Sequence, residues 1–276
     1  MPSVIMRTLI VNFLKAVWLY RPLKNLYDWI FYRSAKTVVS VLNATASLHT
    51  PSKGLTMGLQ TLSEREILEH FLTRLEPGDV VWDVGANIGL YAVLSSRMVG
   101  SSGTVYCFEP EIHTSDMLRR NIALNAIENV RVQNCALGRE DTTGMLFRSS
   151  TSNVGSHSMA QRDGEVAHKG AFINVRSGDS LVRSNELPKP DIVKIDVEGA
   201  EVEVIKGMRE ILRKRFPRVL LVEMHPDVIP LFGDSDKMVL NIMKESRYEV
   251  ALRHQRGDQY HLLFEKSRQT RKRLHR

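Results

Sequence analysis

Cysteine is scarce in this chain of 276 residues, which contains only Cys107 and Cys135. Glycine and proline are not enriched either, at 17 and 10 residues. With 43% hydrophobic and 25% charged residues, the composition is that of a folded globular protein. These counts exclude a disulfide scaffold, a collagen-like chain and a disordered chain. The scarcity of cysteine favours a reducing compartment, and we expect a cytoplasmic protein.

No apolar run is long enough to predict a membrane span. Residues 5–20 are almost wholly apolar, but charged and amide side chains interrupt them, and a spanning helix needs about 20 mostly apolar residues. No small-residue cleavage site follows, which disfavours a signal peptide. Seven of the 19 aromatic residues nevertheless lie within residues 1–32. We expect a helical, aromatic-rich extension over 1–58, packed on the domain or on a second subunit; the alternative is peripheral membrane contact through 1–32.

The net charge of +7 belongs to the two ends of the chain. Residues 1–78 carry +4 and residues 253–276 carry +6, whereas residues 79–252 carry −3. An enzyme acting on nucleic acid more often lines its cleft with cations, so we do not expect a nucleic-acid partner. The tail over 266–276 has six cations and no acid, and such runs are usually solvated, with anionic lipid as the alternative partner.

Strand-like and helix-like segments alternate from residue 59 onward. Capping residues and apolar spacing predict helices over 63–75, 88–98, 113–126, 200–213 and 236–246. Short apolar runs predict strands over 79–84, 103–110, 130–134, 191–196 and 218–223, and a final hairpin over 248–253 and 260–265. Residues 138–178 are less regular, with strand-like pieces at 144–148 and 172–176. This order predicts an α/β fold with a mainly parallel sheet covered on both faces.

Four of the five parallel strands end in an acid. The strand ends are Asp83, Glu109, Asn134, Asp196 and Glu223. Ligands of such sheets bind beyond the carboxyl ends of the strands, so the site is expected at this edge.

The first of these strands runs into a glycine turn with Asp83, Gly85, Asn87 and Gly89. A dinucleotide site would have a second glycine two residues after the first, where the pyrophosphate approaches, but Asn87 occupies that position here. A carboxylate at Asp83 would repel a pyrophosphate and suits an ammonium group, such as that of S-adenosylmethionine. Glu109, at the end of the next strand, can accept hydrogen bonds from both hydroxyls of a ribose. The alternatives are a nicotinamide-dependent oxidoreductase, or glycines that serve the turn alone.

Two motifs then make the chain resemble the FkbM family of class I S-adenosylmethionine-dependent methyltransferases. They are residues 77–89 and residues 191–201, the latter followed by Val222, Glu223, Met224 and His225. The likeness covers about residues 60–250. It implies a Rossmann-like, doubly wound, seven-stranded sheet of order 3-2-1-4-5-7-6 with strand 7 antiparallel. The domain would span 59–265, leaving the basic tail over 266–276.

The resemblance also implies transfer of a methyl group, commonly to a hydroxyl oxygen of a sugar, glycolipid or secondary metabolite. By position, the turn residues Asp83, Gly85, Asn87 and Gly89 would hold the methionine and ribose end of the cofactor. Glu109 would hold the ribose hydroxyls. The adenine would lie beside Asn134, Cys135 and Ala136.

The acceptor hydroxyl must lose its proton, and the carboxyl ends of two further strands offer groups for this step. We expect His225 as the general base, because an imidazole titrates near neutral pH, and Asp196 as second choice. Glu198 and Glu223 are expected to bind the acceptor. The alternatives are a helix-start role for Glu198 and Glu201, a loop role for His225, or a divalent cation on Asp196, Glu198 and Glu223. Since no typical metal-site spacing is present, no metal is predicted.

Three other functions remain as alternatives. A nucleic-acid or protein methyltransferase would use the basic ends, but the strand ending at Asp196 lacks the Asn/Asp-Pro-Pro-Tyr platform of enzymes that methylate bases. A nicotinamide-dependent oxidoreductase is disfavoured by Asp83 and Asn87. A non-catalytic, membrane-associated adaptor would have no need of the cofactor positions.

Overall fold

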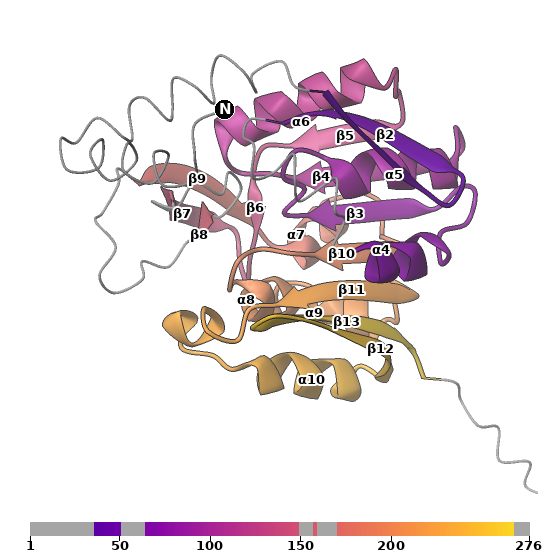
Figure 1. Ribbon diagram of the computed structural model, residues 1–276. Helices are drawn as coiled ribbons and strands as arrows, with labels where there is room; N and C mark the ends of the chain where they lie inside the picture. The colour runs from indigo at the N-terminus through magenta and orange to yellow at the C-terminus, as the bar shows by residue number, and fades with distance from the viewer. Residues whose placement is uncertain (1–35, 51–63, 149–156, 159–169, 268–276) are drawn as a thin grey trace, which may run out of the picture.

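The computed structural model describes residues 36–50, 64–148, 157–158 and 170–267 (Figure 1). The aromatic segment 1–32, most of the predicted extension and the tail beyond residue 267 lie outside these ranges. Among the described residues, no helix has both the length and the apolar character needed to cross a membrane.

A seven-stranded sheet forms the centre of the molecule, with β5 and α6 at one end and β12 and α10 at the other (Figure 1). Its strands are β3 (Val80–Val84), β4 (Thr104–Phe108), β5 (Val130–Gln133), β10 (Ile192–Ile195), β11 (Val219–Met224), β12 (Tyr248–Arg256) and β13 (Gln259–Lys266). They lie in the order β5-β4-β3-β10-β11-β13-β12, and β13 is antiparallel to both of its neighbours. Numbered along the chain, this is the predicted order 3-2-1-4-5-7-6 with strand 7 antiparallel.

Helices cover both faces of this sheet because its strands are apolar on both sides. Val81 and Ile192 point to one core cluster, and their neighbours Trp82 and Val193 point to the other. The first face carries α4 (Arg65–Leu72), α5 (Leu90–Val99) and α6 (Ile112–Leu124). The second carries α7 (Gly178–Arg183), α8 (Glu201–Lys206), α9 (Arg209–Arg213) and α10 (Asp236–Glu245).

The prediction of one continuous helix over 200–213 is wrong, because the structure has two short helices there, α8 and α9. Gly207 separates α8 from α9, and a Cβ at this position would lie 1.9 Å from the carbonyl oxygen of Gly138. Asp179 then accepts hydrogen bonds from the backbone N–H groups of Glu210 and Ile211 and so caps α9. The break therefore follows from a close backbone approach that the helical spacing does not reveal.

Residues 36–49 correct the prediction of a helical extension over 1–58. They form an antiparallel hairpin of β1 (Lys36–Val41) and β2 (Ala44–His49). Buried and more exposed residues alternate along both strands, and the buried apolar residues join the first core cluster. On the outer edge of β2, Asn121 of α6 bonds the backbone N–H and C=O groups of His49. Asn125, which caps the end of α6, does the same with Ser47. The hairpin is thus part of the domain.

A second, smaller sheet lies beside the carboxyl ends of β4 and β5 (Figure 1). It contains β6 (Ala136–Leu137), β7 (Thr142–Arg148), β8 (His157–Ser158) and β9 (Ala171–Arg176), in the order β6-β9-β7-β8. The strand-like pieces predicted within the irregular segment 138–178 correspond to β7 and β9.

Candidate active site

The glycine turn after β3 packs directly on the end of β10. Gly85 has a φ of +75°, and a Cβ there would lie 1.8 Å from the carbonyl oxygen of Asp196. Gly89 begins α5 with a φ of +95°, where a Cβ would lie 2.5 Å from Leu118. Asn87 also has a positive φ, of 50°. The turn therefore needs residues that tolerate the left-handed conformation, and Gly85 needs to have no side chain.

Asp83 is buried at the end of β3, with a side-chain exposure of 2%. Its Oδ1 lies 3.6 Å from the Nζ atom of Lys194, and neither carboxylate oxygen has a hydrogen-bond partner among the described residues. Burial raises the pKa of Asp83, and the charge of Lys194 counteracts that rise. Buried oxygens without hydrogen bonds carry a cost that a ligand with N–H donors would remove.

Lys194 was not predicted as a site residue, although it lies within the motif at 191–201. Its Nζ donates to the carbonyl oxygen of Gly85 at 3.0 Å and to Oδ2 of Asp196 at 3.2 Å, and it lies 5.2 Å from the ring centre of Tyr91. Burial alone would lower the pKa of Lys194, but Asp196 and Asp83 raise it above its usual value. A lysine in an otherwise apolar strand is the signal that could have identified it.

Glu109 follows β4 and is held by backbone N–H groups. Its Oε2 accepts from Asn87 at 3.0 Å and its Oε1 accepts from Glu111 at 3.0 Å. Burial raises the pKa of Glu109 to about 7, although these two hydrogen bonds favour the ionised form. Oδ1 of Asn87 is buried without a hydrogen-bond partner among the described residues.

These residues fit the methionine and ribose parts of S-adenosylmethionine. Asp83 offers two buried acceptor oxygens for the ammonium group, and the amide oxygen of Asn87 offers a third acceptor. Each oxygen of Glu109 retains a second lone pair that can accept from a ribose hydroxyl. A pyrophosphate would meet the same oxygens with like charge.

A hollow of about 390 Å³ lies next to Glu109, between the start of α6 and the small sheet. Asn134 lines it, together with Pro110, Ile112 and Phe172. The amide of Asn134 also donates to the carbonyl oxygen of Glu109 at 2.9 Å. The other two residues predicted at the adenine are not among those that line the hollow: Cys135 packs against the second core cluster, and Ala136 packs against the small cluster of β7 and β9. Their role at the adenine stays a prediction.

His225 and Glu201 form a buried pair behind Asp196. Nδ1 of His225 lies 2.6 Å from Oε1 of Glu201, and the two side chains are 2% and 0% exposed. The same Glu201 oxygen accepts from the backbone N–H of Gly199 at 2.9 Å. Burial would lower the pKa of His225, but the hydrogen bond to Glu201 and the acids Asp196 and Glu198 raise it to about 9.

Glu198 lies on the open side of this pair. Its Oε2 is 3.7 Å from Nε2 of His225, and its side chain is 23% exposed, compared with 30% for Asp196. The pKa of Glu198 is raised to about 7, mainly by burial. The charge of His225 opposes this rise, and the charge of Asp196 adds to it. Its φ of 51° is unusual for a glutamate and marks a backbone strained at the site.

Glu223 is held in a second group of charges. Its carboxylate lies 3.3 Å from Nε2 of His261 and 3.2 Å from a guanidinium nitrogen of Arg256, which also pairs with Glu64. Burial would raise the pKa of Glu223, but His261, His225 and Arg256 lower it to about 2. The assignment of Glu223 to acceptor binding stays a prediction. The structure adds Arg256, His261 and Glu64, which the sequence analysis did not single out.

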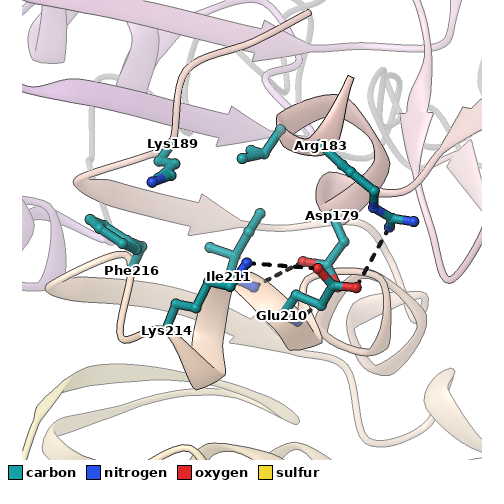
Figure 2. Close-up of a pocket in the computed structure, with 8 residues that line it drawn as sticks. Asp179, Arg183, Lys189, Glu210, Ile211, Lys214 and Phe216 are labelled. Carbon is teal, nitrogen blue, oxygen red and sulfur yellow. Dashed lines mark hydrogen bonds and ion pairs between the residues drawn. The ribbon is translucent and has the colours of Figure 1, made fainter. Parts of the chain in front are cut away.

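Figure 2 shows a different pocket, of about 170 Å³, lined from α7 and α9. Lys189 precedes β10 and Phe216 precedes β11, so the pocket lies at the amino ends of these strands. Glu210 pairs there with Arg183 at 3.8 Å and with Lys214 at 4.0 Å. None of the predicted site residues lines it. The site described above, at the carboxyl ends, is therefore the candidate active site.

The chain is similar to known methyltransferases. The methyltransferase FkbM domain matches residues 83–250. The chain is 33% identical to the hexuronic acid methyltransferase AglP of Haloferax volcanii over 190 residues, which are 68% of this chain and 71% of that protein. It is 37% identical to the 31-O-demethyl-FK506 methyltransferase FkbM of Streptomyces tacrolimicus over 81 residues, 29% of this chain and 30% of that one.

Among solved structures, a methyltransferase FkbM from Methylobacillus flagellatus KT is 17% identical, with a TM-score of 0.45. That similarity covers 78% of this chain and 55% of the other, so the chain spans about half the length of that protein. The domain match extends over more than half of the chain, and the relation to AglP covers more than two thirds of it. The chain belongs to the FkbM family of S-adenosylmethionine-dependent methyltransferases.

Proposed function

We propose that this protein transfers the methyl group of S-adenosylmethionine to a hydroxyl oxygen of a sugar or a related small molecule. The observation that carries the proposal is the set of buried acceptor atoms on Asp83 and Asn87 next to the carboxylate of Glu109. Two relatives, a hexuronic acid methyltransferase and a 31-O-demethyl-FK506 methyltransferase, support a hydroxyl-bearing acceptor by the reactions they are named for.

When bound, S-adenosylmethionine supplies a methyl group that its sulfonium has already activated. The chain must therefore align the acceptor and take up its proton. Asp196 directly follows β10, beside the glycine turn, and Lys194 fixes one of its oxygens at 3.2 Å. Its partly exposed carboxylate can face an acceptor hydroxyl next to the cofactor.

We assign the role of general base, which takes up the acceptor proton, to Asp196. The sequence analysis had placed His225 first for this role. The imidazole of His225 is 2% exposed, Glu201 holds its Nδ1, and Glu198 lies in front of its Nε2. An acceptor would meet the carboxylates of Asp196 and Glu198 first. His225 and Glu201 are then positioning residues, which hold Glu198 and the loop after β10 in place.

The experiment is an acceptor screen with isotopically labelled S-adenosylmethionine. Uronic acids, neutral sugars, glycolipids, RNA and protein extracts would be incubated with the purified chain, and methylated products identified by mass spectrometry. The proposal expects label on a hydroxyl oxygen of a sugar or small molecule, with at least a 100-fold loss of rate in Asp196→Asn. Label on RNA or protein alone would contradict it.

A further inference from the structure

Three potential metal ligands converge on the open side of the candidate active site: Asp196, Glu198 and His225. Each contributes one ligand atom, and these atoms all lie within 4.8 Å of one another. Ligands bound at 2.0–2.3 Å to one cation lie at most about 4.6 Å from each other, so small side-chain movements suffice to bind one. We propose that these residues form a divalent-cation site beside the methyl-transfer position, an inference that rests on the proposed function.

The hydrogen bond of His225 to Glu201 is the arrangement that metal-bound histidines use. A metal-ligating imidazole almost always donates its other ring N–H to a carboxylate or carbonyl, which fixes the tautomer and the ring orientation. Here Nδ1 lies 2.6 Å from Glu201, so the second nitrogen, Nε2, is directed towards Glu198. The 3.7 Å between Nε2 and Oε2 of Glu198 is too long for a hydrogen bond and is suitable for two ligands of one cation.

The second observation is a buried oxygen without a partner. Oε2 of Glu201 has no hydrogen-bond partner among the described residues, although the side chain is 0% exposed. Three carboxylates, those of Asp196, Glu198 and Glu201, thus surround a single imidazole. A cation bound to His225 would offset the negative charge of these carboxylates, which otherwise repel one another.

A neighbouring group with the same kinds of ligand does not need a cation. Glu64, Glu223 and His261 also bring their ligand atoms within 4.8 Å of one another. The guanidinium of Arg256 already lies between the two glutamates, at 2.5 Å from Glu64 and 3.2 Å from Glu223. In the first group, Lys194 donates to Oδ2 of Asp196 at 3.2 Å, and the other oxygen of this carboxylate can serve as a ligand.

A cation at this position would coordinate the acceptor hydroxyl and lower its pKa. With the cation bound, Asp196 would be one of its ligands, and a water molecule would replace Asp196 as the group that takes up the hydroxyl proton. The resulting alkoxide attacks the methyl carbon, the bond from that carbon to sulfur breaks, and the sulfur keeps the electron pair. Two carboxylates and one imidazole suit Mn²⁺ or Mg²⁺, with water or acceptor oxygens at the remaining positions.

The test is titration of the cation-free full chain with Mn²⁺, followed by electron paramagnetic resonance. We expect one Mn²⁺ per chain, displaced by excess Mg²⁺, and at least tenfold weaker binding in Glu198→Gln, whose partly exposed side chain can change without loss of the fold. Glu64→Gln, in the neighbouring group, is the control and should bind Mn²⁺ as the wild type does. No binding, equal binding by Glu198→Gln, or loss of binding in Glu64→Gln would each overturn the proposal.

Titration of the same cation-free protein with S-adenosylhomocysteine separates this inference from the proposed function. If S-adenosylhomocysteine binds and Mn²⁺ does not, the cation site is wrong and the methyltransferase assignment stands. If S-adenosylhomocysteine does not bind, the proposed function fails, whatever the result with Mn²⁺.

Discussion

Nδ1 of His225 lies 2.6 Å from Oε1 of Glu201, and neither side chain is more than 2% exposed. The pair joins the first residue of α8 to the residue that follows β11, 24 positions later in the chain. It therefore fixes the loop after β10, which carries Asp196 and Glu198, against the next strand.

Replacing Glu201 by glutamine should destabilise the protein. The change removes a charge-assisted hydrogen bond between buried groups, which stabilises a fold by about 1.5–3 kcal/mol. Urea denaturation measures the free energy of unfolding. The matched control is Glu203→Gln on the same helix, whose ion pairs lie nearer the surface and should cost at most about 1 kcal/mol. Equal losses in the two variants would contradict the structural role of Glu201.

Asp83→Asn should weaken the binding of S-adenosylhomocysteine by at least 100-fold. The variant removes the negative charge that the ammonium group requires and leaves Lys194 with one acidic partner fewer. Isothermal titration calorimetry gives the affinity, and circular dichroism checks the fold. Asp79→Asn is the control, because Asp79 precedes the same strand at its amino end, where it pairs with Arg218. That variant should lose stability and keep its affinity.

Gly85→Ala should lower stability and cofactor affinity more than Gly100→Ala, although both glycines have a positive φ. The new Cβ would lie 1.8 Å from the carbonyl oxygen of Asp196, so the end of β10 must move. Gly100 has a φ of +67° with nothing within 4 Å of a Cβ, so Gly100→Ala should cost only the backbone strain, about 1–2 kcal/mol. Thermal unfolding and cofactor titration compare the two, and equal effects would count against the close approach.

Cofactor affinity should depend on pH through Glu109. Its pKa of about 7 means that the carboxylate becomes protonated as the pH falls below 7, and one acceptor for the ribose hydroxyls is then lost. The affinity for S-adenosylhomocysteine should therefore fall between pH 7 and pH 6 and level off above pH 8. Glu109→Gln should bind more weakly than the wild type at pH 8, approach the wild-type affinity as the pH falls below 7, and so have a flatter profile. An unchanged slope in this variant would assign the pH effect to another group.

Most of the central sheet could be predicted from the sequence, because its strands are short apolar runs that end in acids. The strand from Val80 to Val84 and the glycine turn after it lie where expected. The hairpin over 36–49 was not predicted, although the polar Ser40 between Val39 and Val41 fits the alternation of a half-buried strand. The prediction of one helical extension over 1–58 depends on the aromatic residues within 1–32 and does not separate residues 36–49 from them.

The site was predicted less completely than the fold, for a physical reason. Glu109 and Asp83 could be placed because the carboxyl ends of adjacent parallel strands meet at one edge. The burial of His225 could not be predicted from the sequence, because it depends on how this side chain packs against Glu201. Arg256 reaches the site only through the register of β12 against β13 and of β13 against β11, which sequence spacing does not specify.

The measurement that tests the central claim most directly is calorimetric titration of the purified chain with S-adenosylmethionine, S-adenosylhomocysteine and NAD. The account predicts micromolar binding of the first two and no heat from NAD. Binding of NAD, or no binding of either adenosyl compound, would contradict the assignment of Asp83, Asn87 and Glu109 as the cofactor site.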